Sequence, residues 1–184
     1  KYNSLSFPTA NCSLYINGIY NQSNSTTEQD VDTLFSVAGI NDGLNQNYTI
    51  KCVMGGNNIT VSDSRVFNVD KTFPYIILNN PIDNLNTTST TINFNWTVVD
   101  AYDDSLLCNL TINGIVEANS IASLNNTPTN YTVYDLSDNI YFWNVTCWDS
   151  TKNTNASETR FYRVDATSPY WLNNNSFPES KSQY

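Results

Sequence analysis

Thirteen asparagines in this 184-residue chain stand in the pattern Asn-x-Ser/Thr, the acceptor of N-linked sugars. The chemistry is a modification of the chain: the side-chain amide takes a sugar, so the acceptor has to reach solvent. With 30 Asn and 40 Ser plus Thr, the composition alone would yield about half as many such patterns. We expect several to be occupied, and the full set is Asn11, Asn21, Asn24, Asn47, Asn58, Asn86, Asn95, Asn109, Asn125, Asn130, Asn144, Asn155 and Asn174.

Five of these acceptors fall in stretches that we expect to be strands, and all five lie opposite the apolar side chains. The clearest stretch is 141–149, because alternate side chains of a strand point to opposite faces. One face carries two aromatics, a valine and a cysteine, which suits a core, and the other carries Asn144. The remaining four are Asn11, Asn47, Asn95 and Asn109. This agreement in facing favours real glycosylation.

Composition excludes several classes of function. The chain has no His, which removes the commonest general base and metal ligand and any Ser-His-Asp arrangement. Asp103 and Asp104 are adjacent on one loop, so they do not offer the separation of a glycosidase pair. A net charge of −9 argues against nucleic-acid binding, and no apolar run is long enough for a membrane span. We therefore predict that the protein is not an enzyme and that it has no cofactor. The attached groups that we expect are covalent N-glycans.

Acidic side chains gather in one loop. Asp100, Asp103 and Asp104 lie close together in sequence, and Asp149 follows the end of the stretch 141–148. Their oxygens would suit Ca²⁺, but the spacing is not that of a regular calcium loop. We favour a solvated turn and keep these four as a weak calcium candidate. Asp70 and Asp165 precede threonines and are expected to cap turns.

The sequence contains an internal repeat of about 95 residues. Cys12–Ile19 matches Cys108–Ile115, and Arg65–Asp70 matches Arg160–Asp165. We therefore predict a first unit at 1–73 that lacks its first strand or strands, a complete second unit at 74–168, and the start of a further unit or a donated strand at 169–184.

The second unit shows seven short strand patterns separated by turn signals. Asn113-Gly114 is a strong signal for a type I′ hairpin turn. Such spacing predicts an antiparallel β-sandwich. The expected strands are 75–78, 90–99, 106–112, 115–121, 131–136, 141–149 and 159–164.

The strands missing from the first unit have candidate replacements in the sequence. The segment 169–174 resembles 74–79, and the join of 182–184 to 1–5 of a following copy resembles 90–96. Two alternatives remain open. The chain is one period of a longer tandem array, or the tail of one molecule donates strands to the next, which is a form of β-augmentation.

Three motifs carry a family resemblance: Cys-x-Leu-x-Ile-Asn-Gly from Cys108, the stretch 136–147, and Val-Asp-Ala-Thr-Ser-Pro at 164–169. They resemble the tandem immunoglobulin-like repeats of prokaryotic, especially archaeal, surface proteins. The resemblance implies an all-β fold of two tandem Ig-like antiparallel β-sandwich domains.

The four cysteines lack CxxC spacing and histidine neighbours, which favours structural disulfides in an oxidising compartment over zinc. Within the resemblance, each domain has one disulfide. Antibody-type domains bridge strands B and F, whereas Cys108 lies just before the Asn-Gly turn. Cys108 and Cys147 are therefore expected on neighbouring strands of one sheet, and the same holds for Cys12 and Cys52.

These features predict the repeating unit of an extracellular, heavily N-glycosylated fibre whose partners are copies of itself. The alternative is the stalk of a surface adhesin or S-layer-type protein, with a carbohydrate or cell-surface contact. Four aromatic side chains are expected at the surface. We favour their packing against the protein's own glycans or at a domain junction. They are Phe142, Trp148, Tyr170 and Trp171.

Overall fold

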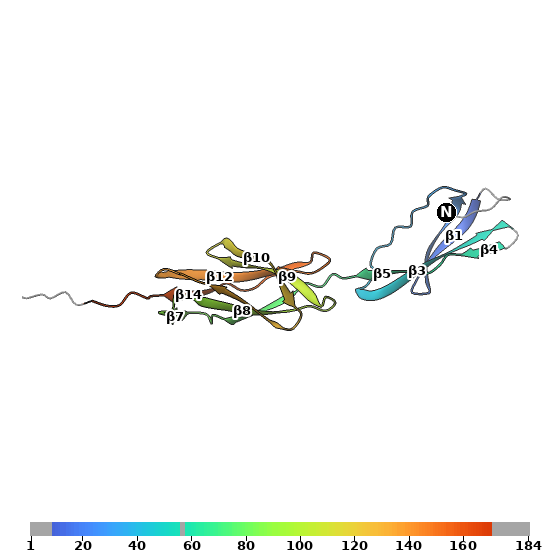
Figure 1. Ribbon diagram of the computed structural model, residues 1–184. Helices are drawn as coiled ribbons and strands as arrows, with labels where there is room; N and C mark the ends of the chain where they lie inside the picture. Colours follow the sequence, from blue (N-terminus) through green and yellow to red (C-terminus); the bar gives the residue numbers. More distant parts are fainter. Residues whose placement is uncertain (1–8, 56–57, 171–184) are drawn as a thin grey trace, which may run out of the picture. The chain divides into compact units, whose positions relative to one another are not determined.

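The computed structural model describes residues 9–55 and 58–170, and these residues form fourteen β-strands. The described part of the chain has no helix long and apolar enough to cross a membrane. It divides into two compact units (Figure 1). The first unit comprises the residues up to Pro74 together with the loops 100–104 and 149–153, and the second comprises the rest. The all-β prediction is confirmed.

The first unit contains one sheet, in the order β2-β1-β3-β4, with β5 also paired to β3. A tight turn joins β1 to β2, because Asn17 and Gly18 both adopt positive φ, as a type I′ turn requires. The strands are β1 (Thr9–Ile16), β2 (Ile19–Glu28), β3 (Gly43–Met54), β4 (Asn58–Val61) and β5 (Arg65–Val69).

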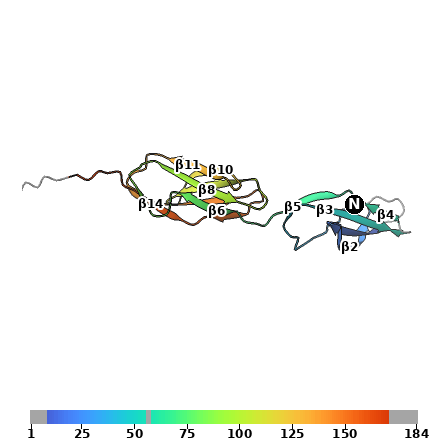
Figure 2. The same ribbon diagram turned by 90° about the horizontal axis from the view of Figure 1, so that it is seen from below.

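The second unit is a sandwich of two sheets. The larger follows the order β10-β9-β12-β14-β7, with β13 paired to β12. The smaller follows β11-β8-β6, and these three strands are labelled in Figure 2. The strands are β6 (Tyr75–Asn80), β7 (Leu85–Thr87), β8 (Ile92–Val99), β9 (Ser105–Ile112), β10 (Ile115–Leu124), β11 (Pro128–Val133), β12 (Asn139–Trp148), β13 (Thr154–Ala156) and β14 (Arg160–Val164).

Alternating side chains of β8, β9 and β12 build the core of the second unit. Sixteen residues form its buried cluster, and Phe94 packs edge-on against both Trp143 and Tyr162. Trp96 donates its indole N–H to Ser123 Oγ at 3.2 Å, which joins the two sheets. The outward face of β12 carries Phe142, as its alternation predicts. Burial of these large rings is the main source of stability for this unit.

Each unit holds one disulfide between neighbouring strands of one sheet. Cys108 lies directly opposite Cys147 on β9 and β12, and Cys12 lies directly opposite Cys52 on β1 and β3. All four side chains are buried. The pairing within each unit, on adjacent strands rather than across two sheets, is therefore confirmed.

The strand pattern departs from the expectation in three places. Two three-residue strands, β7 and β13, have too few alternating positions to show a pattern, and β7 pairs with β14 in parallel. The strand expected at 131–136 is β11, which begins at Pro128 and ends at Val133. Asp135 has a φ of 57°, which is incompatible with continuing the strand.

Candidate functional site

The first unit presents an apolar sheet face. Its hairpin β1–β2 and its strand β3 pair as β9–β10 and β12 do in the second unit. In the second unit the sheet β11-β8-β6 covers the equivalent face, whereas the described residues of the first unit form no second sheet. A cavity of about 760 Å³ lies on that face, and its lining includes Leu14, Ile50 and Phe67. Among the described residues, three form a buried cluster there, against sixteen in the second unit.

The segment 33–38 borders this cavity and has the alternation of a strand without being one. Thr33, Phe35 and Val37 line the cavity, while Leu34 between them is 86% exposed. In the second unit the corresponding connection, between β10 and β12, contains β11, which pairs with β8. Segment 33–38 has no such partner among the described residues, and its backbone forms no ladder. The Ser36 carbonyl accepts Gln22 Nε2 at 2.8 Å, and the rest of the segment's N–H and C=O groups remain open to a further strand.

Thr27 lies where we expect a further strand to contact the first unit. It pairs with Ala10 in the first unit as Ser123 pairs with Leu106 in the second, and both hydroxyl residues are buried. Ser123 accepts the indole N–H of Trp96 from β8. Thr27 lines the cavity and donates to the backbone oxygen of Asn24 at 3.3 Å. The first unit therefore has the hydroxyl of this inter-sheet contact but no counterpart of β8 among its described residues.

The acceptor asparagines avoid the core throughout the described residues. Those on strands that were placed opposite the apolar set do lie there, and none of the twelve described acceptors is buried. Asn174 lies outside the described residues. Six are exposed (Asn11, Asn21, Asn58, Asn86, Asn130 and Asn155) and six are partly exposed (Asn24, Asn47, Asn95, Asn109, Asn125 and Asn144).

Two acceptors lie on neighbouring strands, β9 and β12, on the outer face of the larger sheet. Asn144 pairs with Thr111, which is the threonine of the Asn109 acceptor, and Asn109 pairs with Thr146, which is the threonine of the Asn144 acceptor. Their side chains diverge. Asn109 Oδ1 accepts the backbone N–H of Ser120 on β10, whereas Asn144 Nδ2 donates to Thr159 Oγ1 at 3.4 Å, on the side of β14. The two amides therefore bond to residues on opposite sides of the β9–β12 pair.

A second pair of acceptors lies on the outer face of the smaller sheet. Asn95 and Asn130 face each other across β8 and β11, and Asn95 Nδ2 donates to Asn130 Oδ1 at 2.7 Å. Asn79 donates to Asn95 Oδ1 at the same distance, so three amides form a row across the sheet. The row shows that this face is polar and turned to solvent, as acceptors require.

The acidic candidates are only partly brought together. Carboxylate oxygens of Asp70, Asp100 and Asp103 lie within 4.8 Å of one another, in the first unit. Asp104 is exposed and lies outside this group. Asp149 is buried and instead accepts bonds from Thr151 and Asn153. Three oxygens of this type could hold a hard cation.

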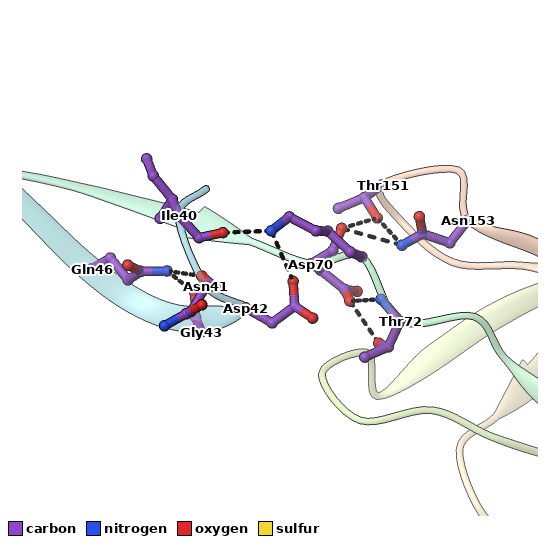
Figure 3. Close-up of polar contacts among 10 residues, drawn as sticks. Ile40, Asn41, Asp42, Gly43, Gln46, Asp70, Thr72, Thr151 and Asn153 are labelled. Carbon is purple, nitrogen blue, oxygen red and sulfur yellow. Dashed lines mark hydrogen bonds and ion pairs between the residues drawn. The ribbon is translucent and has the colours of Figure 1, made fainter. Parts of the chain in front are cut away.

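Asp70 is the member of that cluster that sequence spacing does not reveal. Its Oδ1 accepts the N–H and hydroxyl of Thr72 at 2.9 and 2.6 Å, which confirms the expected turn cap (Figure 3). Its backbone oxygen accepts Asn153 Nδ2 at 3.2 Å (Figure 3). Asp70 is thirty residues from Asp100 in sequence, so only the fold brings the two together.

At the second junction the capping carboxylate is Asp138, and the expectation for Asp165 is corrected. Asp138 accepts the N–H groups of Ala166 and Thr167 at 2.6 and 3.2 Å, as well as the Thr167 hydroxyl. The Thr167 hydroxyl bond, followed by the Ala166 N–H bond, lowers the pKa of Asp138 from its ordinary value. Asp165 contributes its backbone N–H to Thr87. Residues 136–139 are rich in turn formers, which was the available signal.

The surface aromatics differ in exposure. Phe142 is 53% exposed and Tyr170 80% exposed, while Trp148 is half-buried. Phe161 lies opposite Phe142 on β14, with the ring centroids 6.1 Å apart. Trp171 lies outside the described residues. Phe142 and Phe161 therefore lie on the same outer face as Asn144.

The chain matches no protein-family model and no curated protein sequence. Among solved structures it is similar to the fibronectin(III)-like modules of Clostridium thermocellum CbhA. That similarity has a TM-score of 0.47 and 13% identity, and it covers 94% of this chain and 86% of the other.

Proposed function

We propose that this protein is the structural repeat unit of an extracellular, heavily N-glycosylated fibre, in which units join end to end. In this assembly one copy of the repeat supplies a β-strand, and that strand completes the first unit of the adjacent copy. The observation that carries the proposal is the apolar face of the first unit, beside which segment 33–38 alternates like a strand without pairing as one. This assembly extends the resemblance to tandem Ig-like repeats of archaeal-type surface proteins.

The proposed occupant of the face is the segment that begins at Pro169. Its sequence resembles residues 74–79, which in the second unit include most of β6. There Ile76 and Leu78 are buried and β6 pairs with β8. β8 in turn pairs with β11, the counterpart of 33–38. A chain that runs from Pro169 into a counterpart of β8 would therefore bury the cavity lining and pair with the backbone of 33–38. The donor is a further copy or the covalent continuation of the same chain.

The proposed sugar coat follows from the number and facing of the acceptors. At each site the amide Nδ2 attacks C1 of a phosphate-activated oligosaccharide: the C1–N bond forms, the C1–O bond to phosphate breaks, and one amide proton is lost. Twelve described acceptors lie outside the core, on both units. Such a coat would hydrate the surface and cover exposed strand edges, and the role of the protein would be mechanical and protective rather than catalytic.

Extracellular location is supported by the two disulfides. The described residues contain no free cysteine, and pairs of this kind persist in oxidising compartments. Each bridge closes a loop of about forty residues. In the chain-entropy model such cross-links stabilise a domain by restricting its unfolded state.

The test is the intact mass of native material under denaturing, reducing conditions, before and after N-glycan removal. A species that falls to about 20.7 kDa supports separate subunits joined by strand donation and coated with sugar. A species that loses mass but stays very large supports a covalent tandem array. Single chains that elute as monomers without denaturant would contradict end-to-end assembly. An unchanged mass after confirmed deglycosylation would contradict the sugar coat.

A further inference from the structure

We propose that the N-glycan on Asn144 folds back over the exposed Phe142–Phe161 pair, so that its first sugar covers these two rings. The inference rests on the proposed glycosylation and adds a defined contact to it. The occupant of this apolar surface is thus the chain's own sugar rather than another protein.

The aromatic pair is an apolar surface that the described residues leave exposed. Phe142 is 53% exposed, Phe161 is partly exposed, and their rings are tilted by 42° with centroids 6.1 Å apart. The pair lies on the outer face of β12 and β14, away from the buried side chains. Exposed aromatic surface favours any ligand that removes it from water.

The acceptor amide lies in the row of side chains next to this pair. Asn144 lies two residues after Phe142 on β12, so both side chains project from the same face. Its Nδ2, the atom that would carry the sugar, donates to Thr159 Oγ1 at 3.4 Å. Thr159 lies two residues before Phe161, on the side of β14. One hydrogen remains on Nδ2 after substitution, so this contact can persist and hold the sugar beside both rings.

The chemistry of a sugar suits this surface. A pyranose ring has an apolar face of C–H groups that carry partial positive charge, and the face of an aromatic ring is partly negative. Hydroxyl groups on the ring edge stay in water. Because the sugar is tethered, its effective concentration at the rings is high, so a weak contact is sufficient.

The neighbouring acceptor on the same face lacks this arrangement. Asn109 lies on β9 opposite Thr146, four residues along β12 from Phe142, and β9 and β14 flank β12 on opposite sides. A glycan on Asn109 is therefore attached farther from the aromatic pair, on the same face. This makes the contact specific to Asn144.

The experiment uses glycosylated protein from a host that modifies the acceptors, with Asn144 occupancy read by glycopeptide mass. The C–H protons of its first sugar are then recorded by NMR. We expect upfield ring-current shifts in the native protein that are lost in Phe142→Thr. Phe142→Leu, which keeps an apolar side chain, is the second variant. Ile115→Thr, at another exposed apolar position, is the matched control and should keep the shifts.

A thermal measurement tests the same contact. Thr146→Val removes the acceptor but keeps the Asn144 amide. When Phe142 is present, this variant should lower the unfolding midpoint of the second unit by about 2–4 °C. The effect should vanish when Phe142 is already Thr. Thr88→Val, which removes the exposed Asn86 acceptor, should not show this dependence on Phe142.

The outcomes separate the inference from the proposed function. An occupied Asn144 with unshifted sugar protons, or an unmodified Asn144 beside other occupied acceptors, overturns the inference alone. Absence of glycan from every acceptor overturns both.

Discussion

Trp96 on β8 donates its indole N–H to the hydroxyl of Ser123 on β10, and both residues are fully buried. This bond crosses from one sheet of the second unit to the other. Thr27 occupies the position of Ser123 in the first unit, beside a cavity of about 760 Å³. One polar contact thus distinguishes a completed sandwich from one that presents an uncovered face.

Replacing Ser123 with alanine should destabilise the second unit. The indole N–H would lose its acceptor inside the core, which costs about 1–3 kcal/mol of unfolding free energy. Urea unfolding followed by tryptophan fluorescence measures the change. Ser105→Ala, at an exposed position at the start of β9, is the control and should remain within about 0.5 kcal/mol of the native chain. Equal midpoints for the two variants would mean that the bond contributes nothing.

Two stacked tyrosines should respond oppositely to removal of their hydroxyls. Tyr141 and Tyr162 lie 5.2 Å apart, and Tyr141 donates to the backbone oxygen of Ser137 at 3.0 Å. Tyr162 is fully buried, and its hydroxyl has no hydrogen-bond partner among the described residues. Burial, followed by the nearby Tyr141, raises its pKa, so it stays neutral at physiological pH.

Tyr141→Phe should therefore lower the free energy of unfolding by about 1 kcal/mol, while Tyr162→Phe should leave it unchanged or raise it. Chemical denaturation of the two variants in parallel gives both values. A loss in Tyr162→Phe as large as that in Tyr141→Phe would show that the Tyr162 hydroxyl is bonded.

The contact of Asp138 with residues 166–167 should depend on pH. The pKa of Asp138 is lowered in the folded chain, so its contribution to stability is complete above its ordinary value of 3.8 and is lost as pH falls through the lower folded value. NMR titration of the Ala166 and Thr167 amide protons should show a transition below pH 3.8. Asp138→Asn should remove that transition. A transition that persists in this variant would assign it to another group.

The two disulfides should differ in protection from a reducing agent in an unassembled chain. Cys108 and Cys147 are fully buried within the sandwich, whereas Cys12 and Cys52 line the open cavity. Alkylation and mass spectrometry after mild reduction should find Cys12–Cys52 opened first. In assembled material the covering strand should remove this difference. Equal rates in the unassembled chain would indicate that the face is already covered.

Short-range patterns in the sequence predict much of the second unit. Alternation along 141–149 places Phe142 and Asn144 on the outer face, and Asn113-Gly114 marks the hairpin that forms. Contacts between distant residues carry no such local signal. Asp70 joins Asp100 and Asp103, and Asp138 caps Thr167, only because the fold brings together segments that are about thirty residues apart.

Hydrogen exchange at the backbone amides of 33–38 tests the central claim most directly. It compares native assembled material with the isolated chain. If a neighbouring strand pairs with this segment, its amides should exchange slowly in the assembly and rapidly in the isolated chain. Rapid exchange in both states would contradict strand donation, and the apolar face of the first unit would then need a different cover.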